Sequence, residues 1–294
     1  MLAASCGPTQ QATASPQQSN PLELIAEWGV KGEGPGELAE PVGLAVDLND
    51  RVYLADRRTG LLQKFEPTGV PSLAVVDAAA RVATAVAVDS GGAIYLVDAR
   101  GGRVWIHFPD GDLLRNFRVT PQRGADASFG IGVTEAGRVL VPDTGGGRIQ
   151  VFTAAGRLEN VWRLPAGPSG QPARPTAVAT GADEFAYIAD QSGAIAKYTT
   201  GGVQTAVWDA PADSSGPLRG IAASRAHVFA LRGARPRLEV WTFDGRRVLA
   251  DNLGGRFDAE SPALYFAVSR DEQVFVLDPA RPRVFRFRLR LNAP

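Results

Sequence analysis

The sequence predicts an all-β protein, a six-bladed β-propeller built from four-stranded antiparallel blades. Three observations predict this fold: a short apolar run that recurs six times, a strand of small residues ahead of each copy, and a spare N-terminal strand that can close the ring. Glycine (33 residues) and proline (21 residues) are scattered along the 294-residue chain, which favours many turns. No run of about 18 apolar residues follows the N-terminus, so we expect no membrane-spanning helix there.

The recurring run is a five-residue apolar segment that ends in Asp in five of its six copies. The copies are VYLAD (52–56), IYLVD (94–98), VLVPD (139–143), AYIAD (186–190), VFALR (228–232) and VFVLD (274–278). Their last residues are 42, 45, 47, 42 and 46 positions apart. A period of this size is typical of propellers and other repeat folds.

Three further strands accompany each run. An upstream strand comes first, as in GLAVD (43–47) and AVAVD (85–89). Downstream lie a third strand, such as LLQKFE or RIQVFT, and then, after a turn such as EPTG or PDG, a fourth, such as SLAVV or LENVW. Period-two alternation between Gly, Asp and Pro turns indicates short antiparallel strands. Four strands in each of six units predict a six-bladed propeller.

The upstream strand is expected to lie innermost, next to the propeller axis. Its first and third positions are small in nearly every copy: Gly43/Ala45, Ala85/Ala87, Gly130/Gly132, Ala177/Ala179, Gly220/Ala222 and Tyr265/Ala267. The positions between them are large: Leu44, Val86, Ile131, Val178, Ile221 and Phe266. Converging strands leave little room at the axis, so we expect the small residues to face it and the large ones to fill the space between blades. Tyr265, the exception, is expected to plug the channel.

The sixth unit ends after its third strand, and residues 22–28 (LELIAEW) resemble a fourth strand. We predict that they complete the last blade and so remove two exposed sheet edges. Glu23 and Glu27 share one face of this strand, and three arginines share one face of its partner: Arg286, Arg288 and Arg290. Opposite charges across paired strands contribute a few tenths to about 1 kcal/mol each.

Residues 1–21 are predicted to lie outside the fold, and residues 22–294 to form the propeller. Residues 7–21 carry no charge and no aromatic side chain, so we interpret them as a flexible tether. The segment before them, MLAASC, resembles the end of a bacterial lipoprotein signal. That resemblance implies a lipid on Cys6 and export to the bacterial cell envelope, as a periplasmic or outer-membrane lipoprotein. The alternative is an incidental cysteine in a frayed terminus.

Residues 28–69 resemble an NHL repeat. That family's pattern runs aromatic-Gly, a Gly-rich link, Pro-x-Gly-apolar-Ala-Val-Asp, apolar-Tyr-apolar-Ala-Asp, then Arg-apolar-Gln-apolar-Phe and Asp-Gly, and the first unit follows it closely. Units two, three and six match in part, and units four and five depart further, with Arg232 in place of the repeated Asp. The resemblance covers about residues 22–291. It implies the propeller fold but no one function, since the family includes enzymes, sensors and scaffolds.

The glycine-rich stretch GEGPGE (32–37) is not expected to hold a phosphate. Its glycines are spaced Gly-x-Gly-x-Gly, which differs from the dinucleotide fingerprint, and no helix follows. We interpret it as the link from an outer strand to the innermost strand.

The repeated aspartates are candidates for a ring of metal ligands or for turn residues. They are Asp56, Asp98, Asp143, Asp190 and Asp278. Each stands just before a tight turn, where its carboxylate can accept backbone N–H groups. Because carboxylates spread around a propeller lie too far apart to share one cation, we expect them to be structural.

The counts of cysteine and histidine exclude several kinds of site. One cysteine allows no disulfide within the chain, and two histidines, His107 and His227, cannot form a three-histidine zinc centre. Neither histidine lies on a loop predicted to face the axis, so we expect structural roles for both. No Gly-x-Ser-x-Gly motif and no Ser/His/Asp arrangement is recognisable. We expect no catalytic residue, no metal and no cofactor.

The alternative is a lactonase- or lyase-like propeller enzyme with a divalent metal at the channel mouth. Calcium-dependent lactonases of similar shape use acidic and Asn ligands there, and zinc-dependent amidating lyases need more histidines than this chain has. The residues at the starts of the inner strands are not acidic: Val42, Thr84, Phe129, Thr176, Arg219 and Leu264. Glu40 is the only carboxylate close by in the sequence.

The predicted binding face carries the fourth-to-first and second-to-third connections of the blades. The longer ones are 119–128, 163–175, 209–219 and 252–263, and loops on a rigid scaffold are where binding residues concentrate. The candidate ligand-binding residues are Arg123, Arg174, Arg219, Arg232, Arg256 and Tyr265. A convergent arginine cluster would favour a carboxylate or phosphate group. The alternative is a set of solvated loop charges.

The function that these observations favour is non-catalytic. We expect an exported, lipid-anchored binding or scaffold module for a protein, peptide or glycan partner, acting as a monomer and touching a membrane only through its lipid. Lys+Arg and Asp+Glu are both 31, so the net charge is zero and argues against a dedicated nucleic-acid binder. RNA binding, known for some NHL propellers, is a third possibility, against which the neutral balance and the expected export both weigh.

Overall fold

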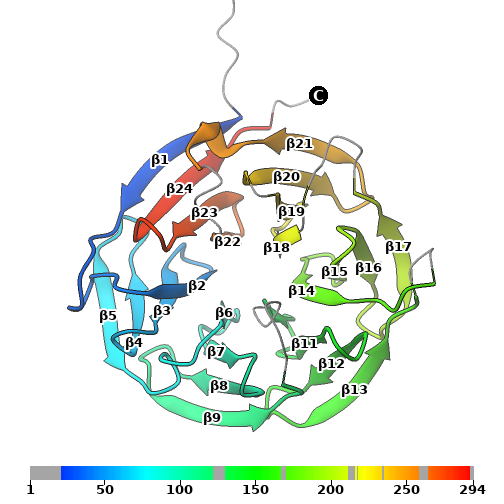
Figure 1. The fold of residues 1–294 in the computed structure, drawn as a ribbon, viewed down its shortest axis with the longest axis horizontal. Coiled ribbons are helices and arrows are strands. Elements are labelled where there is room, and N and C mark those ends of the chain that lie inside the picture. The colour runs from blue at the N-terminus through cyan, green and yellow to red at the C-terminus, as the bar shows by residue number, and fades with distance from the viewer. Residues whose placement is uncertain are drawn as a thin grey trace, which may run out of the picture.

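The computed structural model describes residues 21–121, 130–166, 170–210, 216, 218–233, 235–257 and 264–291. In these residues the chain forms six four-stranded sheets, and Figure 1 shows them as blades around a central axis. Within each of the first five blades the strands follow one another in chain order from the axis outward. The predicted six-bladed propeller is therefore confirmed.

Most strands are four to six residues long. Blade 1 contains β2 (Pro41–Val46), β3 (Val52–Asp56), β4 (Leu61–Phe65) and β5 (Pro71–Val76). Blade 2 contains β6 (Ala85–Val88), β7 (Ile94–Asp98), β8 (Arg103–His107) and β9 (Leu113–Arg118). Blade 3 contains β10 (Gly132–Val133), β11 (Val139–Asp143), β12 (Arg148–Phe152) and β13 (Leu158–Arg163).

The second half of the ring repeats the arrangement. Blade 4 contains β14 (Pro175–Thr180), β15 (Ala186–Asp190), β16 (Ile195–Tyr198) and β17 (Gln204–Trp208). Blade 5 contains β18 (Leu218–Ala223), β19 (His227–Arg232), β20 (Arg237–Thr242) and β21 (Arg247–Asp251), followed by the 3₁₀ turn η1 (Leu253–Gly255). Blade 6 contains β22 (Tyr265–Val268), β23 (Gln273–Asp278), β24 (Arg283–Leu289) and β1 (Leu22–Trp28).

The N-terminal strand closes the ring as predicted. β1 pairs antiparallel with β24, and Glu23 lies opposite Arg288. The Glu23 carboxylate accepts from Arg290 at 2.6 Å and lies 3.7 Å from Arg288. The expected pairing of Glu27 with Arg286 does not form, because a bulge between Leu24 and Ala26 changes the register of the two strands. Arg286 instead contacts Asp50 at 3.2 Å and donates to Gln273.

The inner strands follow the predicted alternation, with a refinement. Five of the six large alternate residues are buried: Leu44, Val86, Ile131, Val178 and Ile221. At Gly43, however, the neighbouring blade sets the size limit, because φ is +65° and an added Cβ would lie 2.6 Å from the Val86 backbone nitrogen. Small residues at such positions let adjacent inner strands approach each other.

Neighbouring blades also meet through a glycine and a large side chain at the ring's edge. Gly69, in the turn after β4, has φ +89°, and a Cβ there would lie 2.3 Å from Cγ of Trp28 in the preceding blade. Four other joints repeat the arrangement: Gly111 on Val75, Gly156 on Phe117, Gly202 on Trp162 and Gly245 on Trp208. These contacts explain why a glycine recurs in each of these turns.

The repeated aspartates serve the turns, as predicted. Asp56 accepts backbone N–H groups of Ala39 and Glu40 at 2.7 and 2.9 Å through one oxygen, and of Arg58 and Thr59 at 3.1 Å through the other. It therefore ties the link that enters β2 to the turn that leaves β3.

The glycine-rich link is held at a second point. The Gln63 side chain accepts from the Gly36 backbone N–H at 2.7 Å and donates to the Glu37 carbonyl at 2.8 Å. With Asp56, it fixes this stretch as a structural joint.

Candidate functional site

A cavity of about 490 Å³ opens on the propeller axis. It is lined by the C-terminal parts of the inner strands and by the turns that connect the first strand of a blade to its second. We call the side of the ring that carries these turns the cavity face. The third position of every inner strand contributes a small lining residue: Ala45, Ala87, Gly132, Ala179, Ala222 and Ala267. The predicted small residues therefore make the hollow in which a ligand can sit.

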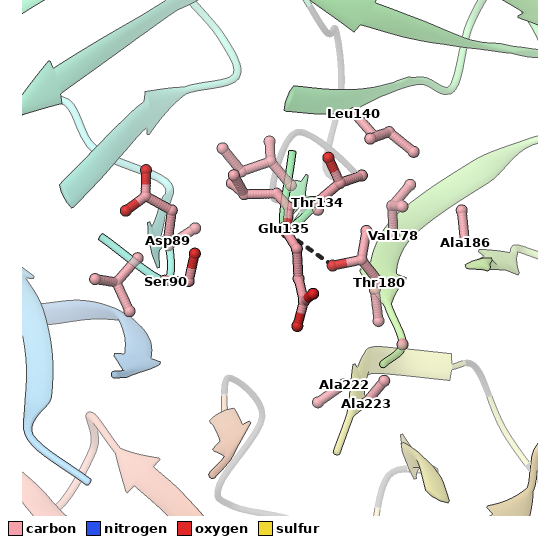
Figure 2. A pocket seen from close by; sticks show the side chains of 18 of the residues that line it. Asp89, Ser90, Thr134, Glu135, Leu140, Val178, Thr180, Ala186, Ala222 and Ala223 are labelled. Carbon is pink, nitrogen blue, oxygen red and sulfur yellow. Dashed lines mark hydrogen bonds between the residues drawn. The ribbon is translucent and has the colours of Figure 1, made fainter. Parts of the chain in front are cut away.

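Charged residues on the turns form the rim of the cavity. Acidic residues come from blades 1 to 4: Asp47, Asp89, Glu135 and Glu184. Basic residues come from blades 3, 5 and 6: Arg138, Arg225 and Arg270. In Figure 2 the Glu135 side chain extends from its turn toward the middle of the cavity. Its carboxylate lies 3.9 Å from the Arg270 guanidinium, which comes from the opposite blade.

Tyrosines hold a carboxylate of the first-to-second turn in three blades. The hydroxyl of a second-strand tyrosine donates to the turn aspartate: Tyr53 to Asp47, Tyr95 to Asp89 and Tyr187 to Asp183. Burial, followed by the charge of the aspartate and the hydrogen bond to it, raises the pKa of each of these tyrosines above the ordinary value. The phenols therefore stay protonated and hold the turns in place.

Blade 3 lines the cavity differently from the other five. Residues from all four of its strands reach the cavity, with Leu140, Val151 and Trp162 lying outside its inner strand. These three side chains are each at most 4% exposed, so they back the cavity wall between blades 3 and 4. The inner strands of these blades are joined by a hydrogen bond of 2.8 Å from the Thr180 hydroxyl to the Val133 carbonyl, which Figure 2 shows as a dashed line.

A serine, a histidine and a glutamate meet at the rim between blades 5 and 6. The Ser224 hydroxyl lies 2.8 Å from Glu272 Oε1, and His227 Nδ1 lies 2.6 Å from the same oxygen. A nucleophilic serine needs its hydroxyl bonded to the histidine, which takes the proton. Here both side chains bond the carboxylate, and the Ser224 hydroxyl also accepts the Ala226 and His227 backbone N–H groups. The cluster supports the turn, as expected for a structural His227.

His107 is also structural. Its side chain is fully buried in β8, and Nε2 lies 2.9 Å from the Asp77 carboxylate, which follows the last strand of blade 1. It therefore joins blade 2 to blade 1 away from the cavity.

Arg232 has an internal partner. Only 2% of the residue is exposed, and its guanidinium lies 3.3 Å from Glu239, itself fully buried, and donates to the Gly193 carbonyl of blade 4 at 2.7 Å. Arg247 approaches the same carboxylate at 3.5 Å. The sequence carries a signal for this pair. Glu239 stands seven residues after Arg232, and at the same spacing after their repeated aspartates blades 1 and 3 have the glutamines Gln63 and Gln150.

The other predicted ligand-binding residues lie away from the cavity or outside the described residues. Arg174 and Arg256 are exposed. Arg219 is half-buried, donates to the Gly233 carbonyl, and has its pKa lowered by burial. Arg123 and Cys6 fall outside the described residues, so their roles stay predictions.

Tyr265 begins the inner strand β22 and packs among core residues of blades 1, 2 and 6. Burial raises its pKa, which nearby Arg57 lowers and Glu40 raises. It does not line the cavity.

The cavity and the predicted binding face are on opposite sides of the ring. More than half of the longer loops 119–128 and 209–219, and half of 252–263, lie outside the described residues. Sequence reasoning favoured that side because loop length is visible in a sequence. The signal for the cavity was subtler: Thr134 and Leu140 stand in blade 3 where blades 1 and 2 have the Asp and Tyr of the rim pairs.

The described ranges contain neither a cluster of metal-ligating side chains nor an apolar helix of membrane-spanning length. In the described ranges, no three His, Cys, Asp or Glu side chains gather closely enough to hold a metal ion. The same ranges contain no helix with the length and apolarity to cross a bilayer.

Comparison with known proteins supports the fold and leaves the function open. No family model matches the sequence, and no curated protein matches it. A streptogramin B lyase superposes with a TM-score of 0.61 at 14% identity, over 92% of this chain and 98% of the lyase. A virginiamycin B lyase from Staphylococcus aureus gives a TM-score of 0.63 at 12% identity, over 92% and 100%.

Another structural neighbour has no lyase in its name. The BBS1N chain of a complex with ARL6DN gives a TM-score of 0.55 at 13% identity, over 87% of this chain and 80% of its own. Such low identities establish a common fold alone, and 1216 chains of solved structures share it. The chain is thus similar in fold to propellers that include lyases and a chain crystallised with a protein partner.

Proposed function

We propose that the protein is an exported, lipid-anchored propeller that binds a protein or peptide partner without catalysis. The observation that carries the proposal is the cavity on the cavity face, an aliphatic hollow with charged turns around it. Its volume of about 490 Å³ lies in the range of ligand sites. Three of the six turns that form the rim are held by Tyr–Asp pairs, which preorganises that part of the site for binding.

Exposed apolar residues also lie on this face. Leu48 lies on the rim and is 50% exposed. Farther out, beside the third-to-fourth turns, lie Val70, Phe108, Leu113, Leu158 and Val203, each between 45% and 63% exposed. These side chains stand singly on different blades, so the central cavity with its charged rim, rather than an apolar patch, supports the proposal.

Selection of peptide binders from a displayed random library, using the full chain as target, tests the binding role. We expect enriched peptides whose affinity falls at least about tenfold with Leu48→Glu, a charge placed at the cavity rim. Arg174→Glu with Arg256→Glu, on the other side of the ring, is the matched control and should leave affinity unchanged. Loss of binding in the control alone would move the site to the loop face, and no enrichment at all would count against peptide binding.

The enzyme alternative has a separate test. The alternative requires elemental analysis of the purified protein to find a stoichiometric divalent ion, and a chelator to lower the Tm by removing it. If both results were obtained, a metal-dependent propeller enzyme would replace the proposal.

The anchor is tested on the natural full-length product. We expect intact mass spectrometry of the protein made in a bacterium to show acyl chains on an N-terminal Cys6. An unacylated mature N-terminus would remove the anchor and leave the binding role standing.

A further inference from the structure

The mouth of the cavity is divided by charge. The acidic residues Asp89, Glu135 and Glu184 stand on the turns of the neighbouring blades 2, 3 and 4. Arg225 and Arg270 stand on the turns of blades 5 and 6. In the ring, blade 2 lies opposite blade 5, and blade 3 lies opposite blade 6 (Figure 1). We call the two parts of the rim the acidic side, blades 2 to 4, and the basic side, blades 5 and 6.

The other two charged residues of the rim are paired beside their own turns. The Asp47 side chain is 3% exposed and accepts a hydrogen bond of 2.7 Å from Arg51. Arg138 lies 3.1 Å from Glu159 of β13 in the same blade. Because each of these charges already has an opposite charge next to it, neither cancels the division of the mouth.

The acidic side offers carboxylate oxygens to a cation. Asp89 accepts hydrogen bonds from uncharged donors, namely the backbone N–H groups of Gly91 and Ala93 and the Tyr95 hydroxyl. These bonds fix the carboxylate without neutralising it. Glu184, two blades along, is exposed. A basic side chain over blades 2 to 4 would form charge-assisted hydrogen bonds with such groups.

The two arginines of the basic side have weak partners. Arg225 lies 3.6 Å from Asp271, and their side chains are 56% and 75% exposed. Arg270 has the 3.9 Å contact with Glu135 across the mouth. Exposed pairs of this kind are screened by water and contribute little to stability. Both guanidinium groups can therefore turn to a carboxylate on a ligand.

The open space under the rim is apolar. The last residue of each inner strand lines it, and we call these six residues the collar: Val46, Val88, Val133, Thr180, Ala223 and Val268. All six are half-buried, so part of each side chain faces the cavity of about 490 Å³. Figure 2 shows Thr180 and Ala223 across the open space from Asp89. An aliphatic side chain that enters along the axis would bury apolar surface against the collar.

We propose that the mouth selects a peptide segment in which an aliphatic residue stands between a basic and an acidic residue. The aliphatic side chain enters the collar, the basic one lies over the acidic side, and the acidic one lies over the basic side. A segment with two charges of the same sign meets like charge on one side of the mouth, which disfavours it. The inference rests on the proposed peptide-binding function and deepens it, because it names the residue pattern that the cavity selects.

Methyl NMR on the full chain, with blocked tripeptides as probes, tests this selection. The probes are acetyl-Lys-Leu-Glu-amide, acetyl-Lys-Leu-Lys-amide, acetyl-Glu-Leu-Glu-amide and acetyl-Lys-Ala-Glu-amide. We expect acetyl-Lys-Leu-Glu-amide to bind at millimolar affinity and to shift the methyl signals of Val88, Val133 and Val268. The two probes with like charges should bind between about three- and tenfold more weakly. The alanine probe should bind severalfold more weakly, because it buries less apolar surface in the collar.

A charge exchange across the mouth tests the division itself. Glu135→Arg with Arg270→Glu keeps an opposite-charge contact but places a cation on the acidic side and an anion on the basic side. We expect the advantage of acetyl-Lys-Leu-Glu-amide over the like-charged probes to fall below about twofold. Glu33→Arg with Arg58→Glu is the matched control, since this pair lies 2.6 Å apart on the other side of the ring with side chains 64% and 67% exposed. It should bind all four probes like the unmodified chain.

A salt titration of the unmodified chain gives the same test without a variant. Raising NaCl from about 20 mM to about 500 mM shortens the range of electrostatic attraction. The preference for acetyl-Lys-Leu-Glu-amide should therefore decrease, while the shifts of the collar methyls remain, because apolar burial does not depend on this screening. A preference that salt leaves unchanged would contradict selection by the charged rim.

The outcomes separate this selection from the wider function. Equal affinities of the three leucine probes, with shifts in the collar, would overturn the charge selection and leave peptide binding in the cavity standing. Library peptides that lose affinity with Leu48→Glu but lack the basic–aliphatic–acidic pattern would do the same. If no probe shifts a cavity methyl and the library yields no binder, the selection and the proposed function fail together.

Discussion

Glu135 and Arg270 come from opposite blades of the ring, yet their carboxylate and guanidinium lie 3.9 Å apart across the mouth of the central cavity. The side chains are 70% and 40% exposed, so water screens the attraction and the pair is worth about 1 kcal/mol or less. Such a contact can be exchanged for contacts with a ligand at little cost in stability.

A double-mutant cycle with Glu135→Gln and Arg270→Gln measures this contact. In urea unfolding we expect a coupling free energy below about 1 kcal/mol, smaller still in high salt. A coupling free energy of several kcal/mol that salt does not change would instead show that the ion pair stabilises the ring.

The glycine joints between blades predict a second set of effects. Gly69→Ala and Gly202→Ala each place a Cβ 2.3 Å from a tryptophan ring atom at positive φ. We expect each to lower the free energy of unfolding by about 2 to 4 kcal/mol, from the left-handed backbone and the overpacking. Gly145→Ala, where an added Cβ meets nothing within 4 Å, is the matched control. Similar losses in all three variants would refute this account of the joints.

The sequence predicts the fold far better than the site, and particular residues show why. VYLAD and its copies report local alternation and turns, and Asp56 does in the structure what its place before a turn predicts. The cavity is assembled from residues of all six blades, and its lining becomes irregular at Gly132 and Leu140, where blade 1 has the pair Ala45 and Tyr53. Arg232 illustrates the same limit, because its burial is set by Glu239 on the next strand and by Gly193 of another blade.

Removal of the closing strand tests how far ring closure stabilises the protein. Deleting residues 22–30 exposes the edge of β24 and removes Leu22 and Trp28, which are 2% and 9% exposed in the core. We expect calorimetry to show a fall in Tm of at least about 10 °C. A chain that begins at residue 21 is the control and should melt like the full-length protein. Equal Tm values for the chain that lacks residues 22–30 and the chain that begins at residue 21 would contradict closure by β1.

The rim tyrosines predict loss of stability at alkaline pH. Burial and the neighbouring carboxylate raise the pKa of Tyr187 above its ordinary value of 10.0. Because the folded-state pKa is the higher one, the stabilisation is complete below about pH 10 and is lost as pH rises from there toward the folded-state pKa. Tyr187→Phe keeps the ring, and Phe229 and Phe275 occupy the same position in blades 5 and 6.

Tm measured from about pH 8 to about pH 11 compares the two chains. Tyr187→Phe should begin less stable, since it loses the bond to Asp183, and should then fall less steeply above about pH 9.5. Parallel profiles would show that the phenol does not contribute to the pH dependence.

The buried Arg232–Glu239 pair predicts that replacing Arg232 alone by the repeated aspartate will destabilise the protein. Arg232→Asp places a second carboxylate beside the fully buried Glu239 and removes its closest cation, and we expect a loss of about 3 to 5 kcal/mol. Adding Glu239→Gln recreates the Asp–Gln combination of blades 1 and 3 and should recover more than half of that loss in chemical unfolding. No recovery would mean that the contact with Gly193, rather than the charge of Glu239, decides the residue at position 232.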